Sequence, residues 1–231
     1  DKIAKPALPI AGLPMLVYPL NFFFEAKVKK LAVNTHHAPE TIRAVLEKIE
    51  QPWELYISHE KKLLDTGGGL KACEAFLKEE RVLLANADIV AGIDIERLLR
   101  FHEARLADLT LVVVPHKDAD KIAPITLGEK DAIVDINRTL DKKSTGKHLY
   151  AGVAVFEPLL WKYLHKEPSS IVYTAYVSLI ASGARVCAYT HEGTWFDCGT
   201  PENYHAASNA VASDAWYWQK ILHPHIRTAF G

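Results

Sequence analysis

The chain alternates between short runs of apolar residues and longer segments in which apolar residues recur every three or four positions. The short runs predict buried strands, and the longer segments predict amphipathic helices. The expected strands lie at residues 30–34, 55–57, 82–87 and 109–114. The expected helices lie at residues 15–26, 39–50, about 70–78 and 94–105. Strands that alternate with helices in this way indicate a parallel sheet.

The pattern changes after Pro115. Two short apolar runs, residues 123–127 and 132–136, flank Gly128-Glu129-Lys130-Asp131, which predicts a β-hairpin. Further strands are expected at residues 150–156, 185–189 and 194–197, and further helices at residues 158–164, 171–182 and 201–212. We therefore predict one α/β domain over residues 1–231, a Rossmann-like open mixed sheet that is mainly parallel and carries a small antiparallel extension. The tail from Asp214 shows no clear period.

Three consecutive glycines, Gly67, Gly68 and Gly69, stand between the strand expected at residues 55–57 and the helix that follows. Glycines that open a helix let the backbone approach a ligand, because no Cβ is in the way. They also leave free N–H groups at the positive end of the helix. The alternative is a flexible loop that needs positive φ angles. The turn is therefore a candidate ligand-binding segment.

Three charged residues stand at positions where ligand chemistry is common. Asp88 follows the strand expected at residues 82–87, Asp197 lies between a strand and a helix start, and Lys5 precedes a proline in an otherwise apolar loop. Two carboxylates at strand ends can hold Mg²⁺, and a lysine nearby adds a fixed charge for phosphate. Each aspartate could instead cap a helix, and Lys5 could be a solvated surface residue.

Charge and cysteine content narrow the class of protein. The formal net charge of -1 removes any electrostatic case for binding bulk nucleic acid or an anionic membrane surface. The cysteines, Cys73, Cys187 and Cys198, are odd in number and widely separated, which is typical of free thiols in a reducing cytoplasm. The most apolar segments are too short or too often interrupted by proline to cross a bilayer. We therefore expect a cytoplasmic protein.

Five segments, taken in order, resemble those of the sugar-1-phosphate nucleotidyltransferases. The resemblance is closest to the branch that contains N-acetylmuramate-1-phosphate uridylyltransferase and related mannose-1-phosphate guanylyltransferases. The segments are the lysine-proline loop at residues 5–12, the glycine turn at residues 59–69, Asn86-Ala87-Asp88, Tyr150-Ala151-Gly152-Val153, and residues 195–201. Their order and spacing match from Asp1 to about Ala210.

The resemblance implies a reaction and a role for each motif. A sugar-1-phosphate oxygen would attack the α-phosphorus of a nucleoside triphosphate, giving a nucleotide-sugar and pyrophosphate. Lys5 would be catalytic, and Asp88 and Asp197 would hold Mg²⁺. The implied nucleotide-binding residues are Thr66, Gly67, Gly68 and Asn86, and the implied sugar-binding residue is Gly152. The nucleotide-binding half would cover about residues 1–115 and the sugar-binding half about residues 116–212, followed by a tail at residues 213–231.

The sequence also departs from the family pattern. The family's first strand and its Gly-rich phosphate loop, with an arginine, are expected to precede Asp1. Ala87 replaces the usual glycine, which requires only that its φ be negative. The lysine of a Glu-Lys-Pro segment before the sugar strand is not evident, although Lys142, Lys143 and Lys147 lie nearby, and this favours the uridylyl-like branch.

Two other functional classes stay open from the sequence. A glycosyltransferase could use Asn86-Ala87-Asp88 as its metal motif, and a non-catalytic homologue could bind nucleotide or sugar phosphate only. The base, the sugar and the oligomeric state also stay open. The aromatic run Trp216-Tyr217-Trp218 could form a homodimer contact or cover the core.

Overall fold

The computed structural model describes residues 2–231 and divides into two compact units. Unit 1 contains the chain up to His59, residues 85–96 and residues 193–231. Unit 2 contains residues 60–84 and 97–192. Each unit is assembled from separate pieces of the chain, so residues that are distant in the sequence share one folded body. The predicted nucleotide-binding and sugar-binding halves are assignments of function, and they stay predictions.

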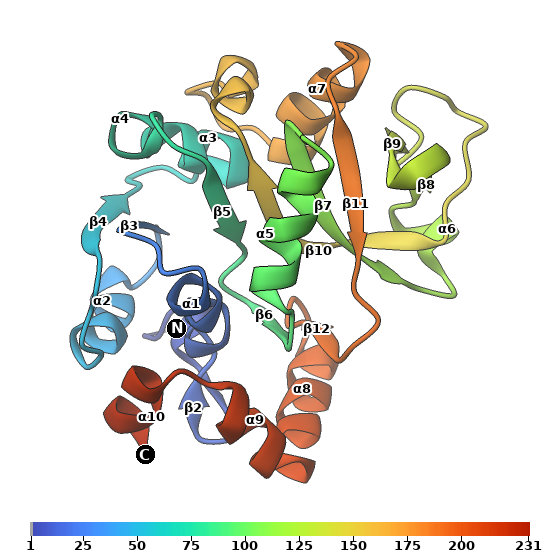
Figure 1. Ribbon diagram of the computed structural model, residues 1–231. Coiled ribbons are helices and arrows are strands. Elements are labelled where there is room, and N and C mark those ends of the chain that lie inside the picture. Colours follow the sequence, from blue (N-terminus) through green and yellow to red (C-terminus); the bar gives the residue numbers. More distant parts are fainter. Residues whose placement is uncertain (1) are drawn as a thin grey trace. The chain divides into compact units, whose positions relative to one another are not determined.

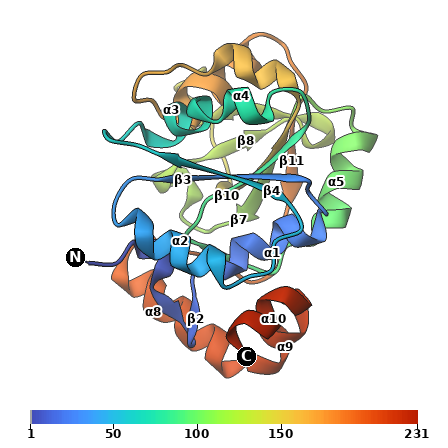
Figure 2. The ribbon, with the colours of Figure 1, turned by 90° about the vertical axis from the view of Figure 1, so that its left-hand side faces the viewer.

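Unit 1 contains three two-stranded sheets and five complete helices longer than one turn, within its described residues. Its elements are η1 (Lys5–Ala7), β1 (Pro9–Ile10), β2 (Leu13–Pro14), α1 (Val17–Glu25), β3 (Lys30–Thr35), α2 (Pro39–Glu47), β4 (Glu54–His59), β6 (Ile89–Ala91), β12 (Trp195–Asp197), α8 (Pro201–Ser213), α9 (Ala215–Ile221) and α10 (Pro224–Phe230), and α5 (Ile95–Ala104) begins in it. The pair β3–β4 is parallel, whereas β1–β2 and β6–β12 are antiparallel. Helices α1 and α2 lie along one face of β3–β4 (Figure 2).

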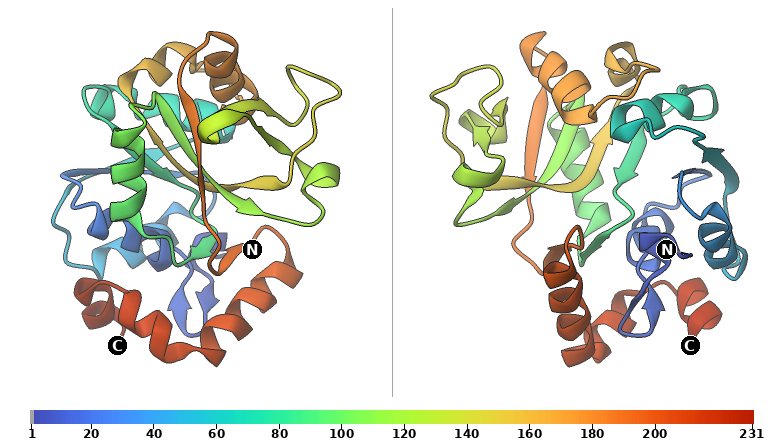
Figure 3. Two further views of the ribbon diagram at one scale, coloured as in Figure 1. Left: turned by 45° about the vertical axis from the view of Figure 1, so that its right-hand side comes forward. Right: turned by 180° about the vertical axis from the view of Figure 1, so that it is seen from behind.

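The core of unit 1 explains its most apolar segment. Helix α1 buries residues around most of its circumference, including Tyr18, Phe22 and Phe24, as expected of a helix that is apolar on all sides. Helix α2 instead buries one stripe, Ile42, Val45 and Leu46, as its period predicts. Helices α8, α9 and α10 follow one another around the β1–β2 hairpin (Figure 3).

Unit 2 is built on one six-stranded mixed sheet. Its strands are β5 (Val82–Ala85), β7 (Leu109–Pro115), β8 (Ile125–Leu127), β9 (Ile133–Ile136), β10 (His148–Phe156) and β11 (Val186–Thr190). The main path runs β11-β7-β10-β8-β9, and β5 also pairs with β10 (Figure 1). The pair β11–β7 is parallel, and β7–β10, β10–β8 and β8–β9 are antiparallel. The mixed sheet and the hairpin expected around residues 128–131 are therefore confirmed.

Helix α5 packs against the sheet of unit 2. On one face Phe101 of α5 packs edge-on against Tyr189 of β11, with ring centroids 5.5 Å apart. The remaining helices are α3 (Asp65–Ala72), α4 (Glu74–Leu77), α6 (Ala119–Ile122), η2 (Glu129–Asp131), η3 (Pro158–Tyr163), the π-helical η4 (Val172–Tyr176) and α7 (Val177–Ala181). Among residues 2–231 the structure contains no helix with the length and apolar content that a bilayer span requires.

The structure corrects two predicted elements. The strand expected at residues 82–87 ends at Ala85, and a further strand that the sequence did not predict, β6, begins at Ile89 in unit 1. The tail from Asp214 is also helical. Asp214 caps α9 by accepting from the Tyr217 N–H at 3.3 Å, and His223 caps α10 ahead of a proline at the first position. These caps were readable in the sequence.

Candidate active site

An antiparallel ladder in unit 1 brings Asp88 and Asp197 together. Strand β6 pairs with β12 so that Ile89 lies opposite Asp197. The ladder is extended by one bond, in which the Cys198 N–H donates to the Asp88 carbonyl oxygen at 3.0 Å. Asp88 therefore lies at the start of one strand and Asp197 at the end of its partner. The two carboxylates belong to the same end of a two-stranded sheet.

Lys5 completes this cluster. Its Nζ forms an ion pair with Asp88 Oδ2, in which the lysine side chain is 45% exposed and the aspartate side chain 22% exposed. The structure thus brings Lys5, Asp88 and Asp197 together within unit 1. Lys5 is exposed, as expected of a solvated surface residue, but its ammonium is paired with Asp88.

The negative charge of the two aspartates in this cluster exceeds the positive charge of the single lysine. Burial by surrounding protein atoms raises the pKa of Asp197, and the neighbouring charge of Asp88 raises it further. The Gly199 N–H, which donates to Asp197 Oδ1 at 2.9 Å, and the Lys5 ammonium oppose these effects without cancelling them. Two carboxylates share one ammonium group, so an additional cation is favoured here.

The backbone around Lys5 is fixed by its own short helix. Pro6 stands at the first position of η1, where its ring sets φ and no N–H is lost to the helix. The Leu8 N–H donates to the Lys5 carbonyl at 3.0 Å, and the Leu16 N–H donates to the Pro6 carbonyl at 2.8 Å. The Ala4 N–H also donates to a threonine hydroxyl of α2 at 3.1 Å. Lys5 is therefore a flexible side chain on a well-held backbone.

The turn after Asp197 is closed by a helix cap. Thr200 caps α8 by accepting from the Asn203 N–H at 3.2 Å, and Asn203 Nδ2 donates to the Asp197 carbonyl at 2.9 Å. Asp197 is therefore not the cap, and Asp88 precedes a strand, so the helix-cap interpretation of both aspartates is wrong. Sequence reasoning missed the roles of Thr200 and Asn203. A threonine followed by a proline and, three residues on, by Asn203 is a readable cap signal.

A buried thiol lies near the two carboxylates. Cys198 is 2% exposed, and burial, followed by the negative charges of Asp88 and Asp197, raises its pKa to about 11. A thiol with so high a pKa stays protonated and packs as a small apolar side chain.

The glycine turn in unit 2 has a different geometry from the expected one. Helix α3 already begins at Asp65, so Gly67, Gly68 and Gly69 are buried inside its first two turns. The Gly67 N–H donates to the Ser169 carbonyl at 2.7 Å and is not free. The flexible-loop interpretation is also wrong, because these residues are helical.

Close packing accounts for two of these glycines. A Cβ on Gly67 would lie 2.7 Å from the Ser169 carbonyl oxygen, and one on Gly68 would lie 2.8 Å from the Glu167 carbonyl oxygen. The hydroxyl of Thr66 accepts from the Ile171 N–H at 3.0 Å, which fastens the helix to the same segment. The nucleotide-binding roles of Thr66, Gly67 and Gly68 stay predictions.

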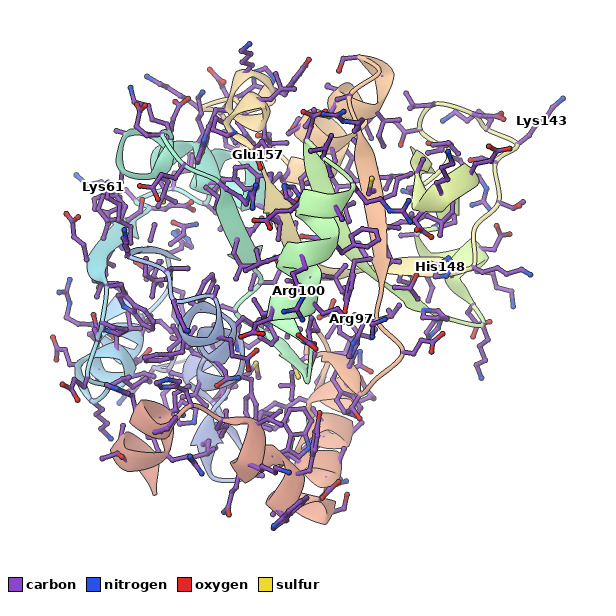
Figure 4. The ribbon with its side chains drawn as sticks, in the orientation of Figure 1. Lys61, Arg97, Arg100, Lys143, His148 and Glu157 are labelled. Atoms are coloured by element: carbon purple, nitrogen blue, oxygen red, sulfur yellow. The ribbon has the colours of Figure 1, made fainter. Side chains whose placement is uncertain are left out.

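The two other predicted contact residues lie at breaks in strands. Gly152 is buried in β10 with a φ of +78°, where the register with β7 shifts, so glycine is favoured at this bulge. Asn86 lies between β5 and β6, and its carbonyl accepts from the Ile89 N–H at 3.4 Å. Their roles in binding sugar and nucleotide stay predictions. Of the lysines near the sugar strand, Lys143 points outward from the loop before β10 (Figure 4).

Comparison with known proteins gives the cluster a context. The family described as "Nucleotidyl transferase" matches residues 1–214. The mannose-1-phosphate guanylyltransferase of Mycobacterium tuberculosis (strain ATCC 25618 / H37Rv) is 27% identical over 203 residues, which cover 87% of this chain and 56% of that protein. The chain therefore spans little more than half the length of this relative.

Solved structures support the fold. Apo UDP-glucose pyrophosphorylase superimposes with a TM-score of 0.75 at 18% identity, covering 92% of each chain. HddC from Yersinia pseudotuberculosis, complexed with GMP-PN, superimposes with a TM-score of 0.72 at 18% identity, covering 90% of each chain. These similarities confirm the predicted α/β fold. Because the family match runs over most of its length, the chain belongs to the nucleotidyl transferase family.

Proposed function

We propose that this chain transfers a nucleotidyl group from a nucleoside triphosphate to a sugar-1-phosphate, giving a nucleotide-sugar and pyrophosphate. The observation that carries the proposal is the Lys5–Asp88 ion pair beside Asp197, within a chain of the nucleotidyl transferase family. The relative from Mycobacterium tuberculosis bears the name of one such transferase. Mannose-1-phosphate and GTP are therefore the first substrates to test, together with UTP.

The reaction requires two anions to approach each other. An oxygen of the sugar phosphate forms a bond to the α-phosphorus, and the bond from that phosphorus to the bridging oxygen of the β-phosphate breaks. Pyrophosphate leaves with the electron pair. Because little covalent work falls to the protein, positioning and charge supply most of the acceleration.

The residues of the cluster fit a magnesium ion. Asp88 and Asp197 offer the hard oxygen donors that Mg²⁺ prefers, and the raised pKa of Asp197 indicates that a further cation would be stabilised between them. When bound, the ion would screen the charge of the phosphates. Among residues 2–231 no group of three or more His, Cys, Asp or Glu side chains is placed to hold a metal ion. In this proposal the protein would therefore supply only the Asp88 and Asp197 carboxylates, and phosphate oxygens and water would supply the other ligands.

Lys5 would act directly on the phosphates. Its ammonium neutralises Asp88 in the structure and lies on a backbone that η1 holds still. An ammonium on a flexible stem can move from a carboxylate to a phosphate oxygen at little cost. We assign nucleotide contacts to Thr66, Gly67, Gly68 and Asn86 as part of the same proposal, and a sugar contact to Gly152. Cys73, Cys187 and Cys198 form no disulfide bonds, which favours the reducing cytoplasm as the location.

The test is a pyrophosphate-release screen. Four nucleoside triphosphates are crossed with a panel of sugar-1-phosphates, with and without Mg²⁺, and Lys5→Ala serves as the site variant. We expect release for at least one pair and a loss of about 10²-fold in the variant, which is typical of removing one preorganised charge contact. Release that does not need the sugar-1-phosphate would contradict the proposal. So would turnover of a nucleotide-sugar to free nucleoside diphosphate, the signature of a glycosyltransferase.

A further inference from the structure

The first turn of α8 contacts both parts of the candidate site. Asn203 Nδ2 donates to the backbone carbonyl of Asp197 at 2.9 Å. The next residue, Tyr204, donates its hydroxyl to the carbonyl of Pro9, in the segment that follows Lys5. Two consecutive residues therefore hold the backbone of the Asp197 turn and the backbone of the lysine loop. Neither side chain was singled out by the sequence motifs.

Tyr204 is itself firmly placed. Its N–H donates to the Thr200 carbonyl at 2.9 Å, which ties it to the cap of α8. Its ring is half-buried and packs against the core of unit 1. Because the ring is held in place, its hydroxyl donates from a fixed position to the Pro9 carbonyl oxygen. The hydrogen bond from Tyr204 therefore fixes the position of the lysine loop relative to the Asp197 turn.

The segment from Lys5 to Pro9 is rigid enough that a movement at one end moves the other end. Pro6 and Pro9 each have a φ fixed by their ring, and the Lys5 carbonyl is bonded to the Leu8 N–H at 3.0 Å. A five-residue segment with two fixed φ angles and an internal hydrogen bond moves nearly as one piece. A displacement at Pro9 would therefore move Lys5.

We propose that Tyr204 is a positioning residue that holds the Lys5 ammonium in register with Asp88 and Asp197. This inference rests on the proposed function. It assigns to the helix after the second aspartate the task of aligning the lysine that acts on the transferring phosphates. Tyr204 acts through the loop and does not contact the reacting atoms.

Other hydrogen bonds to the neighbouring residues limit how far the loop would move if the Tyr204 bond were lost. The Ala11 N–H donates to Ser208 Oγ at 3.3 Å, and the Tyr18 hydroxyl donates to the Ile10 carbonyl at 3.1 Å. Both bonds hold residues of the β1–β2 hairpin that follow Pro9 in the chain. Loss of the Tyr204 bond should therefore loosen the loop without detaching it, so a moderate effect is expected.

The first experiment measures the loop without any substrate. Amide hydrogen exchange is compared in wild type, Tyr204→Phe and the control Tyr173→Phe. Tyr173 is an exposed tyrosine of unit 2 whose hydroxyl accepts from Asn137. In Tyr204→Phe the Leu8 and Leu16 amides should exchange about fivefold faster, the factor typical of one lost neutral hydrogen bond. Unchanged exchange at both amides would overturn the proposal, as would equal acceleration in the control.

The second experiment is a kinetic double-mutant cycle with Lys5→Ala. Tyr204→Phe should lower kcat about tenfold in the wild-type background, with a smaller change in the KM for triphosphate, because a misplaced group costs rate more than binding. In the Lys5→Ala background the same change should cost less than about twofold, since no ammonium remains to be placed. A full loss in both backgrounds would overturn the positioning role. Wild type that releases no pyrophosphate would refute the proposed function, and the exchange result would still decide whether Tyr204 holds the loop.

Discussion

Substituting Asp135 with asparagine should destabilise unit 2 by an amount that its contacts predict. Asp135 is 2% exposed and organises the loop that leads into β10. Its Oδ1 accepts from the Thr139 and Leu140 N–H groups at 3.0 and 3.1 Å. Its Oδ2 accepts from the Asp141 N–H at 3.2 Å and from the Ser144 hydroxyl. One buried carboxylate thus satisfies four donors.

Asparagine keeps the shape but replaces one oxygen by an NH₂ group, which cannot accept from the Asp141 N–H, whereas the Ser144 hydroxyl can turn to accept from it. The Asp141 N–H loses its acceptor, and the hydrogen bonds of Thr139, Leu140 and Ser144 no longer involve a charged group, which lowers each from about 1.5–3 to about 0.5–1.5 kcal/mol. Because Asp141 is exposed and its N–H can turn to water, we expect a net loss of about 3 kcal/mol. For a protein of this size that loss lowers Tm by roughly 6–12 °C.

The loss should also depend on pH. Burial alone would raise the pKa of Asp135, but the hydrogen bonds from Ser144, Leu140 and Asp141 outweigh it, and the net pKa lies below its usual value. A carboxyl group with a lowered folded-state pKa contributes stability that is present above its unfolded pKa, near pH 4. This contribution is lost as the pH falls through the folded-state value. The variant should therefore differ from wild type at pH 7 and approach it in strong acid.

The assay is thermal and urea unfolding of wild type, Asp135→Asn and the control Asp141→Asn. Asp141 lies in the same loop, is exposed, and accepts one bond from the Lys143 N–H at 2.9 Å. The control should lose less than about 1 kcal/mol. A loss of less than about 1 kcal/mol in Asp135→Asn would refute the reasoning, because four donors would then be as well satisfied without the carboxylate.

Three further outcomes are expected. Asp88→Ala and Asp197→Ala should each abolish Mg²⁺-dependent pyrophosphate release with an unchanged circular dichroism spectrum, and turnover above about a hundredth of wild type in either would remove the metal assignment. Gly67→Ala should lower Tm, since its Cβ would lie 2.7 Å from the Ser169 carbonyl, and a neutral or raised Tm would show that the segment yields easily. Burial lowers the pKa of His223, whose ring stacks on an aromatic ring of α1, so the free energy of unfolding should fall as the pH drops below about 6.5. In urea titrations the variant His223→Phe should show a weaker dependence of stability on pH. A dependence identical to that of wild type would contradict this prediction.

Period and local chemistry determined many elements of this protein. Strand β7 was predicted at residues 109–114 and runs Leu109–Pro115, because a continuous apolar run is buried wherever the sheet places it. Helix α8 was predicted to begin with Pro201 and does so, because a proline at the first position and a capping residue act within one turn. The hairpin around residues 128–131 likewise follows from the residues of its own turn.

Contacts between distant segments decided the rest. Periodicity could not show that the run from Val82 breaks after Ala85, because the break depends on β6 leaving to pair with β12. The glycine turn became part of a helix because residues 167–171 pack against it. The grouping of Lys5, Asp88 and Asp197 was implied by family resemblance and came about through strand register and the loop held by α8. Local propensity acts over a few residues, whereas a charged cluster built from three distant segments exists only once the chain has folded.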